Sequence, residues 1–258
     1  MSKAKYQSTT MRGCAVAMAS MFIFNGFLAA DAIAAPEEIQ VYLDDFADVG
    51  KPGLDLHTNY VPSGPQSTNH QFRLTPEFSY GINTNWEVAA YFLTVKNPGG
   101  TVQTDGAKVR TRWRPKAPSA DSPFYWAVNL EFGHLSKRFN PDETSGEIKL
   151  IGVWKTDPWT VGMNFNFDRS LRNSPSQGAT SEIDTKVSYK IREGLEIGAE
   201  NYSFLGANHY DLGQPSSHSN YLASDFSLGK WDLNVGLGRT TGQAPETVLK
   251  AVIGVPLN

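Results

Sequence analysis

The stretch Ala107–Pro115, AKVRTRWRP, alternates between charged and other side chains without a break. One face carries Lys108, Arg110, Arg112 and Arg114, and the other carries Ala107, Val109, Thr111 and Trp113. Because successive side chains of an extended strand leave opposite faces, this period of two predicts a β-strand. Four cations on one face cannot pack against an apolar core without partners. The pattern suits a soluble sheet with one wet face, and it also suits a membrane barrel with a polar inside.

The first 34 residues are predicted to be a secretory signal peptide. Lys3, Lys5 and Arg12 form a basic start, an apolar run follows, and a small-x-small tripeptide, AIA, ends at Ala34. We expect cleavage after Ala34. A retained membrane anchor is the weaker alternative, because Asn25 interrupts the apolar run and the cleavage region follows it directly.

Composition excludes several classes of function. The only cysteine, Cys14, lies in the expected signal, so the mature chain has no disulfide, cysteine metal site or cysteine nucleophile. The signal holds three of the 23 basic and one of the 26 acidic residues, which leaves 20 basic and 25 acidic residues and a net charge near −5. This acidic balance argues against nucleic acid as a partner. No later window approaches the roughly 18 apolar residues of a membrane-spanning helix, and no motif predicts a cofactor.

The mature chain is predicted to be one all-β domain, a transmembrane antiparallel up-and-down barrel. We expect an amino-terminal periplasmic segment or plug over residues 35–52 and the barrel over 53–258. About twelve segments alternate in the manner of strands, and none keeps a helical period. Long connections, rich in glycine, serine and asparagine, alternate with tight turns, apart from one connection of middle length after Pro115. Short periplasmic turns and longer outer loops are typical of outer-membrane barrels.

The distribution of side chains between the two strand faces favours lipid over a second sheet as the outer covering. Ionisable residues gather on one parity, whereas Trp, Phe, Leu, Val and Ile gather on the other. A soluble β-sandwich could cover apolar faces, but it does not call for the rhythm of long and short loops. The tryptophans lie mostly near strand ends, where an aromatic girdle belongs. Arg239 breaks the parity but closes its strand, and Asn258 departs from the aromatic end of many such barrels.

On this interpretation the inward parity supplies the candidate pore-lining residues. They are Arg73, Glu77, Glu87, Lys108, Arg110, Arg112, Glu131, Lys149, Asp168, Asp184, Lys186, Glu196, Glu200, Asp225 and Lys250. Glu87 and Glu131 flank the basic strand, so we expect cross-strand ion pairs with its cations. Such pairs could fill a closed, structural barrel, or a ladder of cations could pass anions and polar solutes. A barrel of about twelve strands is narrower than the open porins of 16–18 strands.

No catalytic or metal-binding residue is predicted. His218-Ser219-Asn220 is the one cluster that suggests a lipid hydrolase, but adjacent strand residues point to opposite faces, so His218 cannot serve Ser219 as a base. The histidines have no metal-ligand spacing, and the acidic loop Asn140–Glu143 lacks the alternating oxygen ligands of a calcium loop. The histidines are His57, His70, His134, His209 and His218.

The chain resembles a family of bacterial outer-membrane barrels described as phenol-degradation (MetA-pathway) or transporter proteins. The similarity rests on short blocks spread over the mature chain, among them IQVYLDDF, RLTPEFSYGI, GAKVRTRW, IGAENYSFLG and VLKAVIGVPL. The resemblance implies a barrel in a Gram-negative outer membrane that passes small compounds, including aromatic or hydrophobic ones. Inward Tyr91, Tyr125, Tyr202 and Tyr221 could line such a path, or they could simply fill the lumen.

The sequence therefore predicts a non-enzymatic, narrow channel or uptake protein in the outer membrane. Its expected partners are outer-membrane lipids, a small-molecule solute and the barrel-assembly machinery. The alternatives are a closed structural or surface-interaction barrel and, less favoured, an outer-membrane lipid hydrolase.

Overall fold

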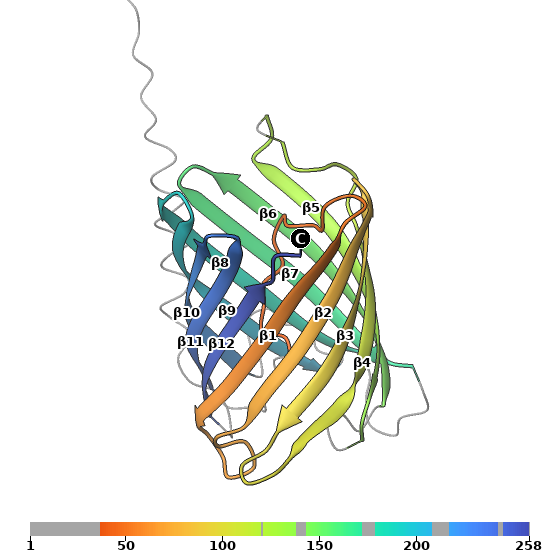
Figure 1. The fold of residues 1–258 in the computed structure, drawn as a ribbon, viewed down its shortest axis with the longest axis vertical. Coiled ribbons are helices and arrows are strands. Elements are labelled where there is room, and N and C mark those ends of the chain that lie inside the picture. The colour runs from red at the N-terminus through yellow and green to blue at the C-terminus, as the bar shows by residue number, and fades with distance from the viewer. Residues whose placement is uncertain are drawn as a thin grey trace, which may run out of the picture.

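The chain forms a closed, tilted β-barrel (Figure 1). The computed structural model describes residues 37–119, 121–137, 143–171, 179–207, 217–241 and 245–257. The expected signal peptide, His209, most of the acidic loop Asn140–Glu143 and Asn258 lie outside these residues.

Twelve strands make the wall, and each pairs antiparallel with the next. The last strand pairs with the first, so the barrel has no free edge, and the predicted fold class is confirmed. The strands are β1 (Pro52–Ser63), β2 (Phe72–Asn83), β3 (Trp86–Lys96), β4 (Val102–Trp113), β5 (Phe124–Leu135), β6 (Thr144–Thr156), β7 (Trp159–Ser170), β8 (Thr180–Arg192), β9 (Leu195–Ala207), β10 (Ser217–Leu228), β11 (Trp231–Thr240) and β12 (Thr247–Gly254).

Some strands are longer than the sequence alternation predicts. β4, for example, begins at Val102, ahead of the alternating stretch Ala107–Pro115. Backbone pairing does not depend on side-chain polarity, so the ladder continues where the apolar face has already ended. A register shift after Leu93 in the pairing of β3 with β4 adds to the mismatch, because a bulge interrupts the period of two.

The two ends of the barrel differ in their connections. The tight connections β2–β3, β6–β7, β8–β9 and β10–β11 share one end, which we call the turn end, with the longer β4–β5 connection. The opposite end, called the loop end, holds the remaining connections. The last described residues return to the turn end, where the Val255 N–H donates to the Leu54 carbonyl at 2.8 Å (Figure 1).

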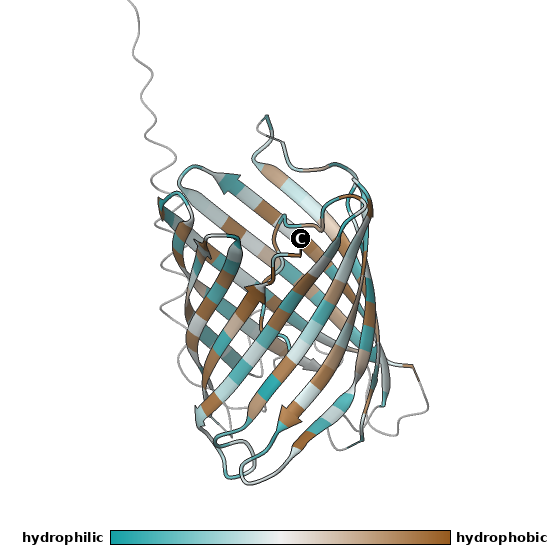
Figure 2. Cartoon of the chain, in the orientation of Figure 1, coloured by the Kyte–Doolittle hydropathy of each residue, from teal (hydrophilic) through white to brown (hydrophobic). Residues whose placement is uncertain are grey.

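Hydrophobic and hydrophilic residues alternate along the strands (Figure 2), and the side chains on the two faces of the wall differ sharply in character. Outward side chains such as Phe78 and Phe132 are 51% and 57% exposed, although both are aromatic hydrocarbons. Trp86, Trp113 and Trp126 form a row of ring contacts near the turn end, with centroids 5.6–6.3 Å apart. Such an apolar belt with an aromatic girdle matches a lipid-facing surface. In the described part of the chain, no helix is long and apolar enough to cross a membrane.

Candidate functional site in the barrel lumen

The structure places all of the predicted pore-lining residues on the inward face of the strands. Ten are almost fully buried, and the other five are half-buried. The buried ones are Glu77, Glu87, Arg110, Arg112, Glu131, Lys149, Asp184, Lys186, Glu200 and Lys250. The half-buried ones are Arg73, Lys108, Asp168, Glu196 and Asp225.

Four of these residues form what we call the arginine cluster: Glu77 of β2, Glu87 of β3, and Arg110 and Arg112 of β4. Arg110 donates to Glu77 through Nε at 3.0 Å and through Nη2, and to Glu87 through Nη1 at 2.6 Å. Arg112 Nη2 lies 3.2 Å from the Glu87 carboxylate. Two cations thus neutralise two carboxylates in a buried site, where an unpaired charge would be very costly.

The ion pairs expected beside the basic strand are confirmed. Glu87 binds Arg110 and Arg112, and Lys108 Nζ lies 2.9 Å from Glu131. Glu77 was not among the expected partners of Arg110. It lies two strands away from β4, and reaches Arg110 because a long guanidinium side chain spans the intervening strand on the concave face of the barrel.

A second set, the Glu200 cluster, lies on the other side of the lumen and joins Lys186 of β8, Glu200 of β9, Asp225 of β10 and Lys250 of β12. Lys186 Nζ lies 3.4 Å from Glu200 and 2.7 Å from Asp225. Lys250 Nζ donates to the second oxygen of Glu200. Two lysines and two carboxylates again balance one another, and their bonds tie four strands together.

Residues 37–49, which we call the lumen segment, run through the barrel interior rather than outside it (Figure 1). Tyr42 lies near the middle and is 2% exposed. Its backbone N–H donates to Asn164 Oδ1 at 2.7 Å, and Asn164 Nδ2 donates to its carbonyl at 3.0 Å. The Asn164 side chain on β7 therefore forms the two backbone hydrogen bonds that a neighbouring strand would otherwise form with Tyr42.

The Tyr42 ring sits among three cations of the wall. Its centroid lies 5.3 Å from Arg110 Cζ, 5.2 Å from Arg112 Cζ and 4.3 Å from Lys149 Nζ, distances typical of cation–π contacts. Burial raises the pKa of the Tyr42 phenol, so the hydroxyl stays protonated and donates to Glu38. Tyr91 donates in turn to the Tyr42 oxygen at 2.7 Å.

Toward the turn end, the lumen segment completes the arginine cluster. The Ala47 N–H donates to Glu87 at 2.5 Å, and the Phe46 ring lies 4.3 Å from Arg112 Cζ. Val49 forms a parallel bridge with Gly81 at the end of β2. A cavity of about 350 Å³ remains between this part of the segment and the turn ends of the strands, lined in part by Tyr42, Phe46, Asp55, Glu87, Arg112 and Asp232.

Toward the loop end, the lumen segment meets apolar and charged groups of the wall. Ile39 and Val41 pack with Val61, Tyr202, Tyr221 and Val248. Lys250 Nζ donates to the Ile39 carbonyl at 3.0 Å, and Lys108 Nζ lies 2.8 Å from Glu37. The segment therefore contacts both charged clusters as it crosses the lumen.

Two inward glycines leave room for the lumen segment. A Cβ at Gly162 of β7 would overlap the Leu43 side chain, and a Cβ at Gly81 of β2 would overlap the backbone of Ala47 and Asp48. At Gly81 the close approach of the backbone requires glycine, whereas at Gly162 a larger residue would displace the Leu43 side chain. The sequence shows these glycines, but only the path of the segment reveals their purpose.

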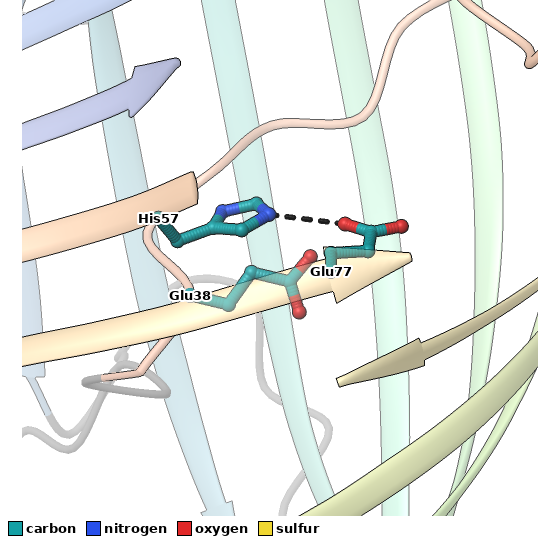
Figure 3. Close-up of side chains that lie close together, drawn as sticks. All are labelled: Glu38, His57 and Glu77. Carbon is teal, nitrogen blue, oxygen red and sulfur yellow. Dashed lines mark hydrogen bonds and ion pairs between the residues drawn. The ribbon is translucent and has the colours of Figure 1, made fainter. Parts of the chain in front are cut away.

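Glu38, His57 and Glu77 meet beside the arginine cluster (Figure 3). His57 Nε2 donates to Glu77 at 3.0 Å, and one ligand atom from each residue lies within 4.8 Å of the others, so the set could hold a metal ion. Arg110 also binds Glu77, so a metal dication would lie beside a guanidinium. In this arrangement His57 and Arg110 both donate to Glu77, and the Tyr42 hydroxyl donates to Glu38. Spacing in the sequence could not reveal it, because Glu38 comes from the lumen segment.

The inward tyrosines are all buried: Tyr91, Tyr125, Tyr202 and Tyr221 are 1–6% exposed. Tyr202 and Tyr221 make an edge-to-face contact at 5.7 Å, and the Tyr202 hydroxyl donates to Glu200 at 2.8 Å. They contact the lumen segment and the charged clusters, so they contribute to the packing of the lumen in the closed arrangement.

The hydrolase-like pair suggested by the sequence is split between the two faces of β10. Ser219 is 1% exposed and lies inward, whereas His218 lies on the outer face with its Nδ1 3.0 Å from Ser203 Oγ. Ser203 carries a single hydroxyl proton and donates it to Asn201 Oδ1 at 2.6 Å. His218 therefore does not act on Ser203 as a base in this arrangement.

A closed antiparallel barrel with an apolar outside and a charged inside defines a transmembrane β-barrel, the class to which this fold belongs. Solved structures with this fold include the NanC porin (TM-score 0.57, 14% identity, 79% of this chain and 100% of that chain) and the KdgM porin (0.55, 10%, 79% and 99%). An outer-membrane channel from Pseudomonas putida F1 gives a TM-score of 0.60 at 10% identity, over 84% of this chain and 99% of that chain. No family model and no curated protein matches the chain.

These likenesses establish the fold. Membership of the phenol-degradation family that the sequence resembles stays a prediction.

Proposed function

We propose that the protein is a narrow outer-membrane channel for small solutes and that the lumen segment closes it. The observation that carries this proposal is how the segment is held. Side chains and single hydrogen bonds fix residues 37–48, and the only backbone bridge with the wall in the described residues lies at Val49. A barrel closed for good could fill its lumen with strand side chains, whereas a separate segment can leave without breaking the wall.

The charged lining supports passage of polar or amphipathic solutes once the segment has moved. Cations and carboxylates alternate around the lumen, so both signs are available to a passing solute. Solved barrels of this fold include the KdgM porin in complex with disordered oligogalacturonate. That complex makes a small-molecule solute a reasonable expectation for this chain.

Aromatic solutes are the finer part of the proposal. The Tyr42 ring occupies a position among Arg110, Arg112 and Lys149, and an aromatic solute entering the lumen would find the same cations if the ring withdrew. In this proposal the Tyr42 ring occupies the binding position of such a solute while the channel is closed, which we call its placeholder role.

Single-channel recording from the refolded mature protein in a planar bilayer tests the proposal. We expect brief, low-conductance openings, and we expect an added aromatic carboxylate such as benzoate to alter their frequency or block them. A salt gradient across the bilayer would then report the selectivity. A folded barrel that stays silent under all these conditions, and also after the lumen segment is displaced, would refute the channel.

The second candidate is a closed structural or surface-interaction barrel, favoured by the neutral ion-pair clusters that line the lumen. The two candidates differ in one result. A permanently closed barrel stays silent even when the lumen segment is displaced, whereas the channel then conducts steadily.

A further inference from the structure

A polar patch interrupts the apolar belt on the outer face of β9, β10 and β11. It consists of Asn201, Ser203, His218, Asn220 and Arg239, all with outward side chains. Neither the lumen nor the proposed channel uses these residues.

The depth of the patch in the membrane follows from the position of its residues along their strands. Ser203, Asn220 and Arg239 each lie eight residues from the turn end of their strand, at Leu195, Leu228 and Trp231. On β5, β6 and β7, the residues eight positions from the turn end are instead exposed and apolar, namely Phe132, Ile148 and Phe167. The patch therefore lies near the loop-end margin of the apolar belt, where other strands still face lipid tails.

The hydrogen bonds of the patch run in one direction. His218 Nδ1 donates to Ser203 Oγ at 3.0 Å, and Ser203 donates to Asn201 Oδ1 at 2.6 Å. Asn201 Nδ2 then donates to Asn220 Oδ1 at 2.9 Å. The chain of bonds ends with the Asn220 amide nitrogen as a remaining donor.

Arg239 stands directly beside that donor. Asn220 and Arg239 are paired residues in the register of β10 and β11, and both are exposed. No ion pair to Arg239 is found within the described part of the chain, and the described outward positions of β8 to β12 hold no carboxylate. A guanidinium and an amide N–H₂ side by side match a ligand that only accepts hydrogen bonds, above all a phosphate.

We propose that this patch binds the phosphorylated headgroup of a glycolipid in the outer leaflet. The patch faces the bilayer at the loop end, which is the outer side of an outer-membrane barrel, and its unopposed charge is positive. A phosphate at this position would neutralise Arg239 while the acyl chains of the same lipid cover Leu222 and Leu237, the next outward pair toward the turn end, which are 75% and 54% exposed.

Native mass spectrometry of the full mature protein in detergent tests the site. The probe is lipid A with its two phosphates, compared with the same lipid after dephosphorylation. We expect wild type to retain the phosphorylated lipid and Arg239→Gln to bind it about tenfold more weakly, because a charge-assisted bond to phosphate is lost. Asn220→Leu should weaken it too, and this variant makes the outer face more apolar, so folding is not at risk.

Arg169→Gln is the matched control. Arg169 is also an exposed, outward arginine near the loop end, on β7, but it pairs with Gly146 and has no paired amide side chain among the described residues. We expect its variant to retain the lipid as wild type does. Equal retention by Arg239→Gln and wild type, or equal retention of the dephosphorylated lipid, would overturn the proposal. So would a wild-type dimer that Arg239→Gln dissociates, because a second copy would then cover the patch.

Discussion

The arginine cluster and the Glu200 cluster are alike in charge but differ in what completes them. Each joins two cations and two carboxylates in the lumen wall. The arginine cluster also takes a backbone N–H from Ala47 and the rings of Tyr42 and Phe46, all from the lumen segment. The Glu200 cluster gives the segment one hydrogen bond, from Lys250 to the Ile39 carbonyl.

This difference assigns two roles to two similar sets of charges. The Glu200 cluster links β8, β9, β10 and β12 and is complete without the lumen segment, so we infer that it stabilises the wall. The arginine cluster presents unsatisfied cation faces if the segment leaves. Closure of the lumen, and in our proposal the binding of a solute, therefore depends on the arginine cluster.

The largest expected effect is a loss of stability in Glu200→Gln. The neutral amide leaves Lys186 and Lys250 close together and buried with one carboxylate fewer. Breaking a buried ion pair in this way lowers the free energy of unfolding by about 3–5 kcal/mol. The free energy of unfolding is measured by urea titration in lipid vesicles, with tryptophan fluorescence as the signal. Glu196→Gln on the same strand serves as the control, because Glu196 is half-buried and bound by Ser188. Equal losses in both variants would remove the special role of Glu200.

Gly162→Leu is expected to raise the conductance of the channel severalfold. A leucine here would occupy the space of the Leu43 side chain, because a Cβ at this position already overlaps Leu43 Cδ2, and the remaining leucine atoms would extend into the lumen segment. The displaced lumen segment should leave a larger steady conductance in planar bilayers. Gly152→Leu controls for the added side chain, because Gly152 faces outward opposite Trp126. If both variants conduct like wild type, the segment does not close the lumen.

Tyr42→Ala is expected to give a smaller rise in conductance than Gly162→Leu. The alanine loses the three cation–π contacts but keeps the backbone bonds to Asn164, so the segment stays in place with a gap at its centre. Added aromatic carboxylate should then block the current more strongly than in wild type, because the cations are open to it. The outward Tyr80→Ala is the control. A block that is the same in all three proteins would contradict the placeholder role of Tyr42.

The smallest effect is expected from Lys155→Ala. Its ion pair with Asp44 of the lumen segment, at 3.3 Å, is half exposed, and such pairs contribute about 0–1 kcal/mol. Conductance and unfolding midpoint should both match wild type within error. A clear rise in conductance would show that the mouth of the barrel, rather than its middle, holds the segment.

The wall of the barrel could be predicted from the sequence, because a period of two reports directly which face a side chain takes. The alternation of Arg110 and Arg112 with Val109 and Trp113 predicted which side chains of β4 face inward and which face outward. Because β3 and β5 neighbour β4 in sequence order, the ion pairs of Glu87 and Glu131 with its cations could also be predicted. The position of Arg239 was also visible as a break in parity.

The contacts of the lumen segment could not be predicted. From the sequence, IQVY around Tyr42 could be a short strand or a segment folded across the barrel mouth, and its neighbours are side chains far away in the sequence, such as Asn164 and Lys149. Glu77 likewise finds Arg110 across an intervening strand, because inward side chains converge in a closed barrel. Such contacts depend on the curvature of the wall, which local patterning does not encode.

The most direct test of the account compares the mature protein with a variant that lacks residues 37–49, both refolded into planar bilayers. Heat-modifiable gel mobility first verifies that both form barrels. We expect rare, small openings for the complete chain and a steady, larger conductance for the shortened one. Identical currents, or silence from both folded proteins, would contradict the claim that the lumen segment closes a channel.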